Sequence, residues 1–249
     1  MKQLFTLQPG ALKLAQLREW WQAPQQLSLH AEAHEAIQRS FQTVHDVLAA
    51  GKVVYGINTG FGLLANTRIP PEKLNDLQRR IVLSHAAGTQ ELMPDTVVRL
   101  MLLLKINSLS RGYSGVRPEV IQALVELLNH EVYPCVPSKG SVGASGDLAP
   151  LAHLVLPLLG EGTVRIQGAI YPAVEGLAKV GLKPIGTLAP KEGLALLNGT
   201  QASTALALHG LFQIERVFHA ALVTGAMAVE AAMGSRSEER RVGKECRSR

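Results

Sequence analysis

One segment in the middle of the chain constrains the fold more than any other, because its residues are apolar on nearly every side of a helix. The segment from Asp95 to Gly112 has a helical pattern with apolar residues on all faces: Val98, Leu100, Met101, Leu102, Leu103, Leu104, Ile106 and Leu109. Such a helix has to be buried in a large core or at a contact between subunits. We therefore expect Asp95 to cap a central helix that ends at Gly112.

The rest of the sequence predicts a mainly α fold with a small mixed region. The chain has 249 residues and is 47% hydrophobic but only 4% aromatic, a composition typical of helices packed through aliphatic side chains. Helical patterns cover about 12–21, 31–50, 71–87, 148–159 and 200–233, and two short helices precede the last of these. Another helix starts at Pro118, with one buried face marked by apolar residues up to Leu128. We expect a strand at 4–7, a hairpin at 164–171 and a long structureless loop from 131 to 146.

That loop contains a glycine-punctuated run, Gly140-Ser-Val-Gly-Ala-Ser-Gly-Asp147, directly before a helical pattern. In a tight loop the Gly146 nitrogen can attack the Ala144 carbonyl carbon, because glycine is unhindered and tolerates strained dihedral angles. Loss of two water molecules, one of which takes the Ser145 hydroxyl, would leave a ring with an electrophilic methylidene carbon. The alternative from these residues alone is a plain loop, with Asp147 as the N-cap of the next helix and Pro150 in its first turn.

Four further motifs accompany this run: Tyr55-Gly-Ile-Asn-Thr-Gly-Phe-Gly62, Ser84-His85-Ala-Ala-Gly88, Lys105-Ile-Asn-Ser-Leu-Ser-Arg-Gly112 and Leu196-Leu-Asn-Gly-Thr-Gln201. In order and spacing the five motifs closely resemble the histidine ammonia-lyases, a branch of the aromatic amino-acid ammonia-lyase family. The resemblance extends from Met1 to about Gly234. It implies the helical, L-aspartase-like fold of that family, with the active-site loops carried by the small mixed region of its N-terminal part.

The resemblance also implies a reaction, a carbon–nitrogen lyase that deaminates L-histidine to trans-urocanate and ammonia as the first step of histidine degradation. Its prosthetic group would be a 4-methylidene-imidazol-5-one (MIO), formed autocatalytically from Ala144, Ser145 and Gly146. Tyr55 would be the catalytic base, although a phenol titrates near pH 10 and needs help from its surroundings to act at neutral pH. The sequence leaves open whether the substrate's amine or its ring bonds to the electrophile.

The resemblance places three substrate-binding residues at His85, Asn198 and Ser84. Asn198 would contact the substrate carboxylate, and His85 would hydrogen-bond an imidazole. The pair Ser84-His85 is similar to that of histidine lyases, whereas tyrosine and phenylalanine lyases tend to have other pairs at this place. Read without the resemblance, His85 is a core histidine at a helix end, Asn198-Gly199 is a turn, and Asn58 and Thr59 are residues that hold a loop.

Two alternative functions stay open at this stage. One is a tyrosine or phenylalanine ammonia-lyase or aminomutase, which would use the same chemistry on another substrate. The other is an inactive truncated fragment or a non-catalytic helical scaffold. The family's chains are much longer and share active sites between the subunits of a homotetramer, so we expect the 249-residue chain by itself to lack lyase activity.

Composition and charge exclude several other classes of partner. The two cysteines, Cys135 and Cys246, cannot build a disulfide framework, which favours a reducing, cytoplasmic location. We expect no membrane span and no nucleic-acid partner, because no long apolar run and no basic face with aromatic residues occur. We also expect no metal: His30 and His34 have a spacing that could hold zinc, but they lack the H-E-x-x-H order and an evident third ligand.

The last fourteen residues differ in kind from the rest of the chain. Residues 236–249 are almost without apolar side chains and carry +3 of the formal net charge of +5. We interpret residues 1–235 as the N-terminal, prosthetic-group-bearing part of the fold, truncated within a helix. Residues 236–249 would be a non-native polar tail, similar to translated adapter DNA, and we exclude it from functional reasoning.

Overall fold

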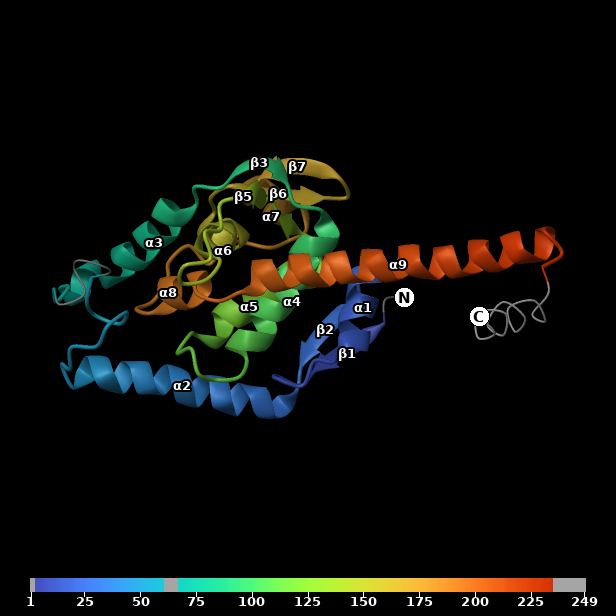
Figure 1. Cartoon of the computed structure of the whole chain (residues 1–249). Helices are drawn as coiled ribbons and strands as arrows, with labels where there is room; N and C mark the ends of the chain where they lie inside the picture. Colours follow the sequence, from blue (N-terminus) through green and yellow to red (C-terminus); the bar gives the residue numbers. More distant parts are fainter. Residues whose placement is uncertain (1–2, 61–66, 235–249) are drawn as a thin grey trace, which may run out of the picture. The chain divides into compact units, whose positions relative to one another are not determined.

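The apolar segment in the middle of the chain forms helix α4 (Asp95–Leu109), and it is buried as expected. Ten of its residues are buried in the computed structural model, and most of them are fully inaccessible to solvent. Helix α4 packs against α1 (Leu14–Gln22) and α5 (Pro118–Asn129), whose apolar faces cover it. Figure 1 shows α4 and α5 side by side in green. The expected central helix is thus confirmed, and its last turn ends before Gly112.

The structure describes residues 3–60 and 67–234, which fall into two units, residues 1–207 and 208–249. The other helices are α2 (Ala31–Ala49), α3 (Leu74–His85), α6 (Leu148–Val155), α7 (Ala173–Lys179), α8 (Glu192–Leu197) and α9 (Gln201–Ala231), with 3-10 turns η2 (Pro71–Lys73) and η3 (Leu156–Leu159). The predicted mainly α fold is therefore confirmed. Outside the described residues lie Phe61 and Gly62 of the Tyr55 motif, Ser235 at the expected domain boundary, and the tail 236–249 with Cys246.

Three small sheets lie in the first unit. Strands β1 (Leu4–Leu7) and β2 (Gln26–Leu29) pair in parallel with Leu4 opposite Gln26. Strands β6 (Thr163–Ile166) and β7 (Ala169–Pro172) form the expected hairpin, with Thr163 opposite Pro172. The strand at 4–7 and the hairpin were predicted; β2 was not, because four residues show too little alternation to be read as a strand.

The segment from Glu131 to Gly146 is not structureless, contrary to our expectation. It contains β4 (Tyr133–Pro134), which pairs antiparallel with β6, and β5 (Pro137–Lys139), which pairs antiparallel with β3 (Thr89–Leu92). The two short strands are held by distant partners and have no local periodicity of their own, so the prolines and glycines gave a loop pattern. The longest stretch of this segment outside helices and strands runs from Gly140 to Gly146.

The expected cap at Asp95 is also wrong. Pro94 occupies the N-cap position of α4, and Asp95 is the first residue of the helix. The Asp95 carboxylate instead accepts a hydrogen bond from the Arg165 guanidinium on β6 at 2.7 Å. This ion pair ties the start of the central helix to the hairpin sheet.

The second unit is described here by itself. Its described residues, 208–234, comprise the remainder of α9 and a short turn. Many of its apolar side chains are exposed, among them Ile214, Val217 and Phe218. Within the described residues, no helix is long and apolar enough to cross a membrane.

The close approach of α2 to the end of α4 predicts a costly glycine substitution. Gly112 has φ of +74°, and a Cβ added there would lie 2.5 Å from the Ala36 carbonyl oxygen of α2. We expect Gly112→Ala to lower the free energy of unfolding by about 1–2 kcal/mol through its left-handed conformation and by a further 1–3 kcal/mol through overlap. Gly168→Ala is the matched control, because Gly168 has φ of +83° with open space around it. Urea unfolding compares the two, and equal losses would contradict the overlap.

A contact between α6 and the segment after α3 predicts a pH dependence. The Gly88 N–H donates to Nε2 of His153 at 3.0 Å, so the imidazole has to be neutral for the bond to form. Burial lowers the pKa of His153 below its ordinary value of 6.5. The unfolded chain therefore binds more protons, and we expect the free energy of unfolding to fall as the pH drops below about 6.5.

Urea unfolding between pH 5 and 8 measures this slope. The control variant is His153→Gln, since a glutamine oxygen can accept from Gly88 but does not titrate. The variant should show a smaller loss of stability on acidification than the unsubstituted protein. An unchanged slope would mean that other groups carry the pH dependence.

Candidate functional site

The tripeptide Ala144-Ser145-Gly146 lies on a loop that is pressed against the junction between α8 and α9. Gly146 has φ of +116°, and a Cβ there would lie 2.7 Å from the Gly199 carbonyl oxygen. The next residue, Asp147, donates its backbone N–H to the same oxygen at 2.8 Å. Only glycine fits at position 146, because any side chain would separate the two backbone segments. Ala144 and Ser145 are exposed on the other side of this contact.

The buried Asp147 carboxylate holds the loop through three hydrogen bonds. It is 1% exposed and accepts hydrogen bonds from Ser203 N at 2.7 Å, Ser203 Oγ at 2.5 Å and Ser141 Oγ at 2.8 Å. Burial by itself raises the pKa of Asp147, but the hydrogen bonds from Ser203 and Ser141 outweigh it, so the pKa lies below its ordinary value. The carboxylate is therefore ionised and links both sides of the tripeptide loop to the first turn of α9.

This arrangement corrects the plain-loop alternative for Asp147. The residue does occupy the N-cap position of α6, but its side chain makes no capping hydrogen bond there. It satisfies an N–H group in the first turn of α9 instead, where a negative charge is stabilised by the helix dipole. The sequence pattern thus gave the N-cap position of α6 correctly, but the Asp147 carboxylate bonds to the first turn of α9.

Four of the predicted site residues line one cavity of about 560 Å³: Tyr55, His85, Ser145 and Asn198. They come from four segments that are far apart in the chain. The other lining residues are Ile81, Ser108, Leu109, Tyr113, Ser114, Leu148, Lys191, Leu194, Ala195 and Leu197. Ala144, Gly146 and Ser84 were predicted for the site as well but are not among the residues that line this cavity.

Tyr55 is placed at the cavity by a tight turn that rests on α8. Gly56 has φ of +77°, and a Cβ there would overlap the Leu194 side chain. Asn58 closes the turn, since its Oδ1 accepts from Val54 N at 2.9 Å and its Nδ2 donates to Lys52 O at 2.7 Å. Asn58 and Thr59 are both buried, which favours their reading as residues that hold the loop.

His85 lines the cavity, and a hydrogen bond within α3 defines which of its ring nitrogens carries the proton. Its Nδ1 lies 2.8 Å from the Ile81 carbonyl oxygen, one turn earlier in α3. Because a carbonyl oxygen only accepts, Nδ1 carries the proton and Nε2 of the neutral ring keeps its lone pair. Ser84 Oγ donates to the same carbonyl at 3.1 Å and lies 3.2 Å from Nδ1. Ser84 therefore contacts His85 at Nδ1 and helps to fix the orientation of the imidazole ring.

Asn198 follows directly on α8, where the helix ends. Its backbone N–H and its Nδ2 both bond to the Leu194 carbonyl oxygen, at 3.1 and 2.9 Å. The side chain is exposed to the cavity, and Oδ1 accepts no hydrogen bond from any residue that the structure describes. This oxygen and the second Nδ2 hydrogen are available to a ligand.

Sequence reasoning did not assign four polar residues of the cavity to the site: Ser108, Tyr113, Ser114 and Lys191. Lys191 has φ of +75° and donates from Nζ to the Ser114 carbonyl oxygen at 2.8 Å, and burial lowers its pKa. Tyr113 and Ser114 follow the motif that ends at Gly112, which is the one signal that could have found them. For Lys191 no local pattern exists, because its place depends on the distant Ser114.

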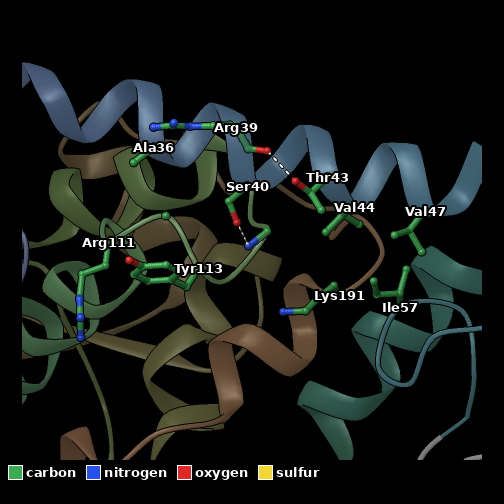
Figure 2. Close-up of a pocket in the computed structure, with 12 residues that line it drawn as sticks. Ala36, Arg39, Ser40, Thr43, Val44, Val47, Ile57, Arg111, Tyr113 and Lys191 are labelled. Carbon is green, nitrogen blue, oxygen red and sulfur yellow. Dashed lines mark hydrogen bonds between the residues drawn. The ribbon is translucent and has the colours of Figure 1, made fainter.

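A second cavity of about 570 Å³ adjoins the first and shares Tyr113 and Lys191 with it (Figure 2). It lies between α2 and the segment from Arg111 to Gly115. Its hydroxyl groups on α2 are engaged in the fold, because Thr43 Oγ1 donates to Arg39 O at 3.0 Å and Ser40 Oγ accepts from Gly115 N at 2.9 Å. None of the predicted site residues lines it, so the first cavity is the candidate site.

The histidine pair considered for zinc does not form a metal site in the described part of the chain. His30 is the N-cap of α2, and its Nδ1 accepts weakly from Glu32 N at 3.4 Å. Among residues 3–60 and 67–234, no group of three or more His, Cys, Asp or Glu side chains could hold a metal ion.

Comparison with known proteins identifies a family for this chain. The sequence model of the family described as aromatic amino acid lyase matches residues 12–248. Histidine ammonia-lyase of Idiomarina loihiensis is 71% identical over 94% of this chain and 45% of that protein, and the Vibrio cholerae enzyme is 64% identical over 92% and 45%. The chain thus spans about half the length of the curated relatives it matches.

Solved structures show the same fold. The structure is similar to histidine ammonia-lyase of Trypanosoma cruzi with a TM-score of 0.85 and 34% identity, over 96% of this chain and 47% of that one. It is also similar to ergothionase of Treponema denticola, with a TM-score of 0.82 and 29% identity over 86% and 43%. Since the family model covers nearly the whole chain and the motif residues meet at one cavity, the chain belongs to the aromatic amino acid lyase family.

Proposed function

We propose that the protein, at the length of its curated relatives, deaminates L-histidine without oxidation to trans-urocanate and ammonia. The observation that carries the proposal is the cavity at which Tyr55, His85, Ser145 and Asn198 meet. The relatives named histidine ammonia-lyase, at 64–71% identity, favour histidine over tyrosine or phenylalanine as substrate. In this proposal residues 1–235 are the part of the fold that bears the prosthetic group, and the whole enzyme is a cytoplasmic homotetramer.

The tripeptide loop fits the MIO group that the family implies. Gly146 is held where no side chain is tolerated, and its backbone is bent to φ of +116°. The ionised Asp147 ties the loop to Ser141 and Ser203 on either side, so the backbone is restrained before any cyclisation. Ser145, whose hydroxyl would be lost as water, lines the cavity. Formed from Ala144, Ser145 and Gly146, the group would supply an electrophilic methylidene carbon at this place.

The chain's own residues have separate tasks in this proposal. Tyr55 removes the proton from the carbon next to the substrate ring, and it lines the cavity from a restrained turn. Asn198 binds the substrate carboxylate through its amide. The lone pair on His85 Nε2 accepts a hydrogen bond from the imidazole N–H of the substrate, and Ser84 orients His85.

A helix terminus adds to the electrostatics of the site. The tripeptide directly precedes α6, which begins at Leu148. The N-terminus of a helix carries about half a positive charge. Placed beside the cavity, it stabilises negative charge that develops during the reaction, and such preorganised dipoles are typically among the largest contributions to catalysis.

The substrate is tested with an enzyme of family length, made by joining residues 1–234 to the C-terminal half of the Idiomarina loihiensis relative. We expect it to form urocanate from L-histidine, measured by absorbance, and to form neither cinnamate from phenylalanine nor coumarate from tyrosine at a comparable rate. Formation of cinnamate or coumarate in preference to urocanate would overturn the proposal in favour of the other lyases.

The prosthetic group predicts a mass change in the tripeptide. In the family-length enzyme, we expect the peptide that spans Ala144-Ser145-Gly146 to be lighter by two water molecules. Ser145→Ala should abolish both this difference and the activity, whereas Ser138→Ala, at an exposed serine of the neighbouring β5, should keep both. Mass spectrometry of the digested proteins provides the measurement. An unmodified tripeptide in a fully active enzyme would refute the assignment.

The role of Tyr55 predicts a loss of turnover with the prosthetic group intact. We expect Tyr55→Phe to lower kcat by at least the roughly 10²-fold that is typical for loss of a general base. The mass difference at the tripeptide should remain, because Tyr55 lies outside it. The matched control is Tyr113→Phe, since Tyr113 lines the same cavity and should lower kcat much less. Near-normal turnover of Tyr55→Phe would make Tyr55 a structural residue.

A further inference from the structure

Helix α4 buries two cationic side chains, which its apolar pattern did not predict. Arg99 is 5% exposed and Lys105 is 1% exposed. Removing a cation from water is costly unless hydrogen bonds replace its hydration. Both side chains donate hydrogen bonds to carbonyl groups in the last turn of a neighbouring helix. The last carbonyl groups of a helix have no partner within that helix.

Arg99 shows what this arrangement does for the fold alone. Its Nε donates to the Trp20 carbonyl oxygen at 2.6 Å, and an Nη donates to that of Trp21 at 2.8 Å. Both acceptors lie in the last turn of α1, and none of these three residues lines the candidate site. Arg99 is thus a link between α4 and α1 and has no contact with the cavity.

Lys105 makes the same kind of link at the cavity itself. Its Nζ donates to the Ala195 carbonyl oxygen at 2.8 Å and to the Asn198 carbonyl oxygen at 2.7 Å. Ala195 lies in α8, Asn198 is its C-cap, and both line the candidate site. Burial lowers the pKa of Lys105 to about 7. The charged and the neutral amine both retain at least two N–H donors, so both carbonyl groups stay bonded in either state.

The two bonds fix the turn from which the Asn198 side chain leaves the backbone. The Asn198 side-chain amide is hydrogen-bonded to the Leu194 carbonyl one turn earlier. The orientation of the amide therefore depends on the orientation of the turn from Ala195 to Asn198. If the two Lys105 bonds were lost, the Ala195 and Asn198 carbonyl groups would lose this donor, and the turn would no longer be tied to α4.

We propose that Lys105 is a positioning residue for substrate binding, because it holds the Ala195–Asn198 turn and thereby sets the place of the Asn198 amide at the cavity. The inference rests on the proposed function, in which Asn198 binds the substrate carboxylate. It assigns no contact between Lys105 and the substrate. Lys105 should therefore affect ligands that have a carboxylate and leave the rest of substrate recognition unchanged.

The test compares two ligands that differ in the carboxylate alone. Binding of L-histidine and of histamine is measured by calorimetry in the Ser145→Ala form of the family-length enzyme, in which no turnover occurs. Lys105→Met keeps most of the apolar stem of the side chain but removes the amine and both of its hydrogen bonds. We expect it to raise the Kd of L-histidine at least tenfold, within the ~100-fold that misplacement of a contact can cost, and to change the Kd of histamine less than twofold.

Two further variants show whether the effect acts through Asn198. Asn198→Ala should weaken L-histidine similarly, and the double variant should be no weaker than Asn198→Ala alone, because residues that act on one contact are not additive. Arg99→Met is the matched control for a buried cation on the same helix. It should lower the unfolding midpoint without changing the Kd of either ligand.

Several outcomes would overturn the inference. Equal losses for L-histidine and histamine, an additive double variant, or a Lys105→Met variant that behaves like Arg99→Met would make Lys105 a residue of the core. Should Lys105→Met not fold, Lys105→Gln replaces it in the same comparison. If neither folds while Arg99→Met does, Lys105 is again structural and the inference is wrong. Failure of the unsubstituted enzyme to make urocanate is a separate result that overturns the proposed function.

Discussion

The short junction between α8 and α9 is the point on which the candidate site depends. Lys105 bonds to the Asn198 carbonyl, and Asp147 N–H bonds to the Gly199 carbonyl beside it. Gly146 approaches the same Gly199 oxygen so closely that a Cβ would collide with it. Lys105 of the central helix and the tripeptide loop therefore contact two successive carbonyl groups, those of Asn198 and Gly199. Since Asn198 and Ser145 both line the cavity, the geometry between them is set at this junction.

Helix α8 is held at both ends by buried charged groups, which explains how six residues can be placed accurately. At its start, the fully buried Glu192 carboxylate accepts from Arg117 N at 2.9 Å, from Arg117 Nε at 2.8 Å and from Ala189 N at 2.6 Å. At its end, Lys105 bonds to two carbonyl groups. So short a helix is marginal by itself. Hydrogen bonds to these two buried side chains supply directional restraints that apolar packing of six residues would not.

Much of the fold could be predicted, because it depends on patterns within single segments. The apolar faces of α4 and α5 and the hairpin at β6 and β7 follow from local periodicity. The short strands β2, β4 and β5 and the partner of Asp147 could not be predicted, since each depends on a residue dozens of positions away. Asp147 is the clearest example: its sequence context indicates an N-cap, and only the folded chain shows that it satisfies α9 in place of α6.

The same distinction applies to the candidate site. Tyr55, His85, Ser145 and Asn198 stand in short motifs whose residue types already carry the chemistry, so they could be named in advance. Lys105 and Lys191 could not, because a lysine in an apolar helix or in a loop has no local signature of its role. Such residues act through backbone carbonyl groups, and any residue type can supply a carbonyl. Sequence patterns therefore find the candidate reactive groups but miss the residues that hold the backbone around them.

In the proposed function, the choice between histidine and the other aromatic substrates would depend on the lone pair of His85 Nε2. The Ile81 carbonyl oxygen accepts a hydrogen bond from His85 Nδ1–H, so Nε2 can only accept a hydrogen bond while the ring is neutral. An imidazole ring brings an N–H to meet it, whereas a phenyl ring leaves Nε2 unpaired against an apolar surface. Sites that hydrogen-bond a substrate group reject analogues without it more strongly than sites that recognise shape alone. Because Ser84 and Ile81 fix the acceptor before any ligand arrives, the α3 helix end sets substrate selectivity in the proposed function, separately from the tripeptide loop.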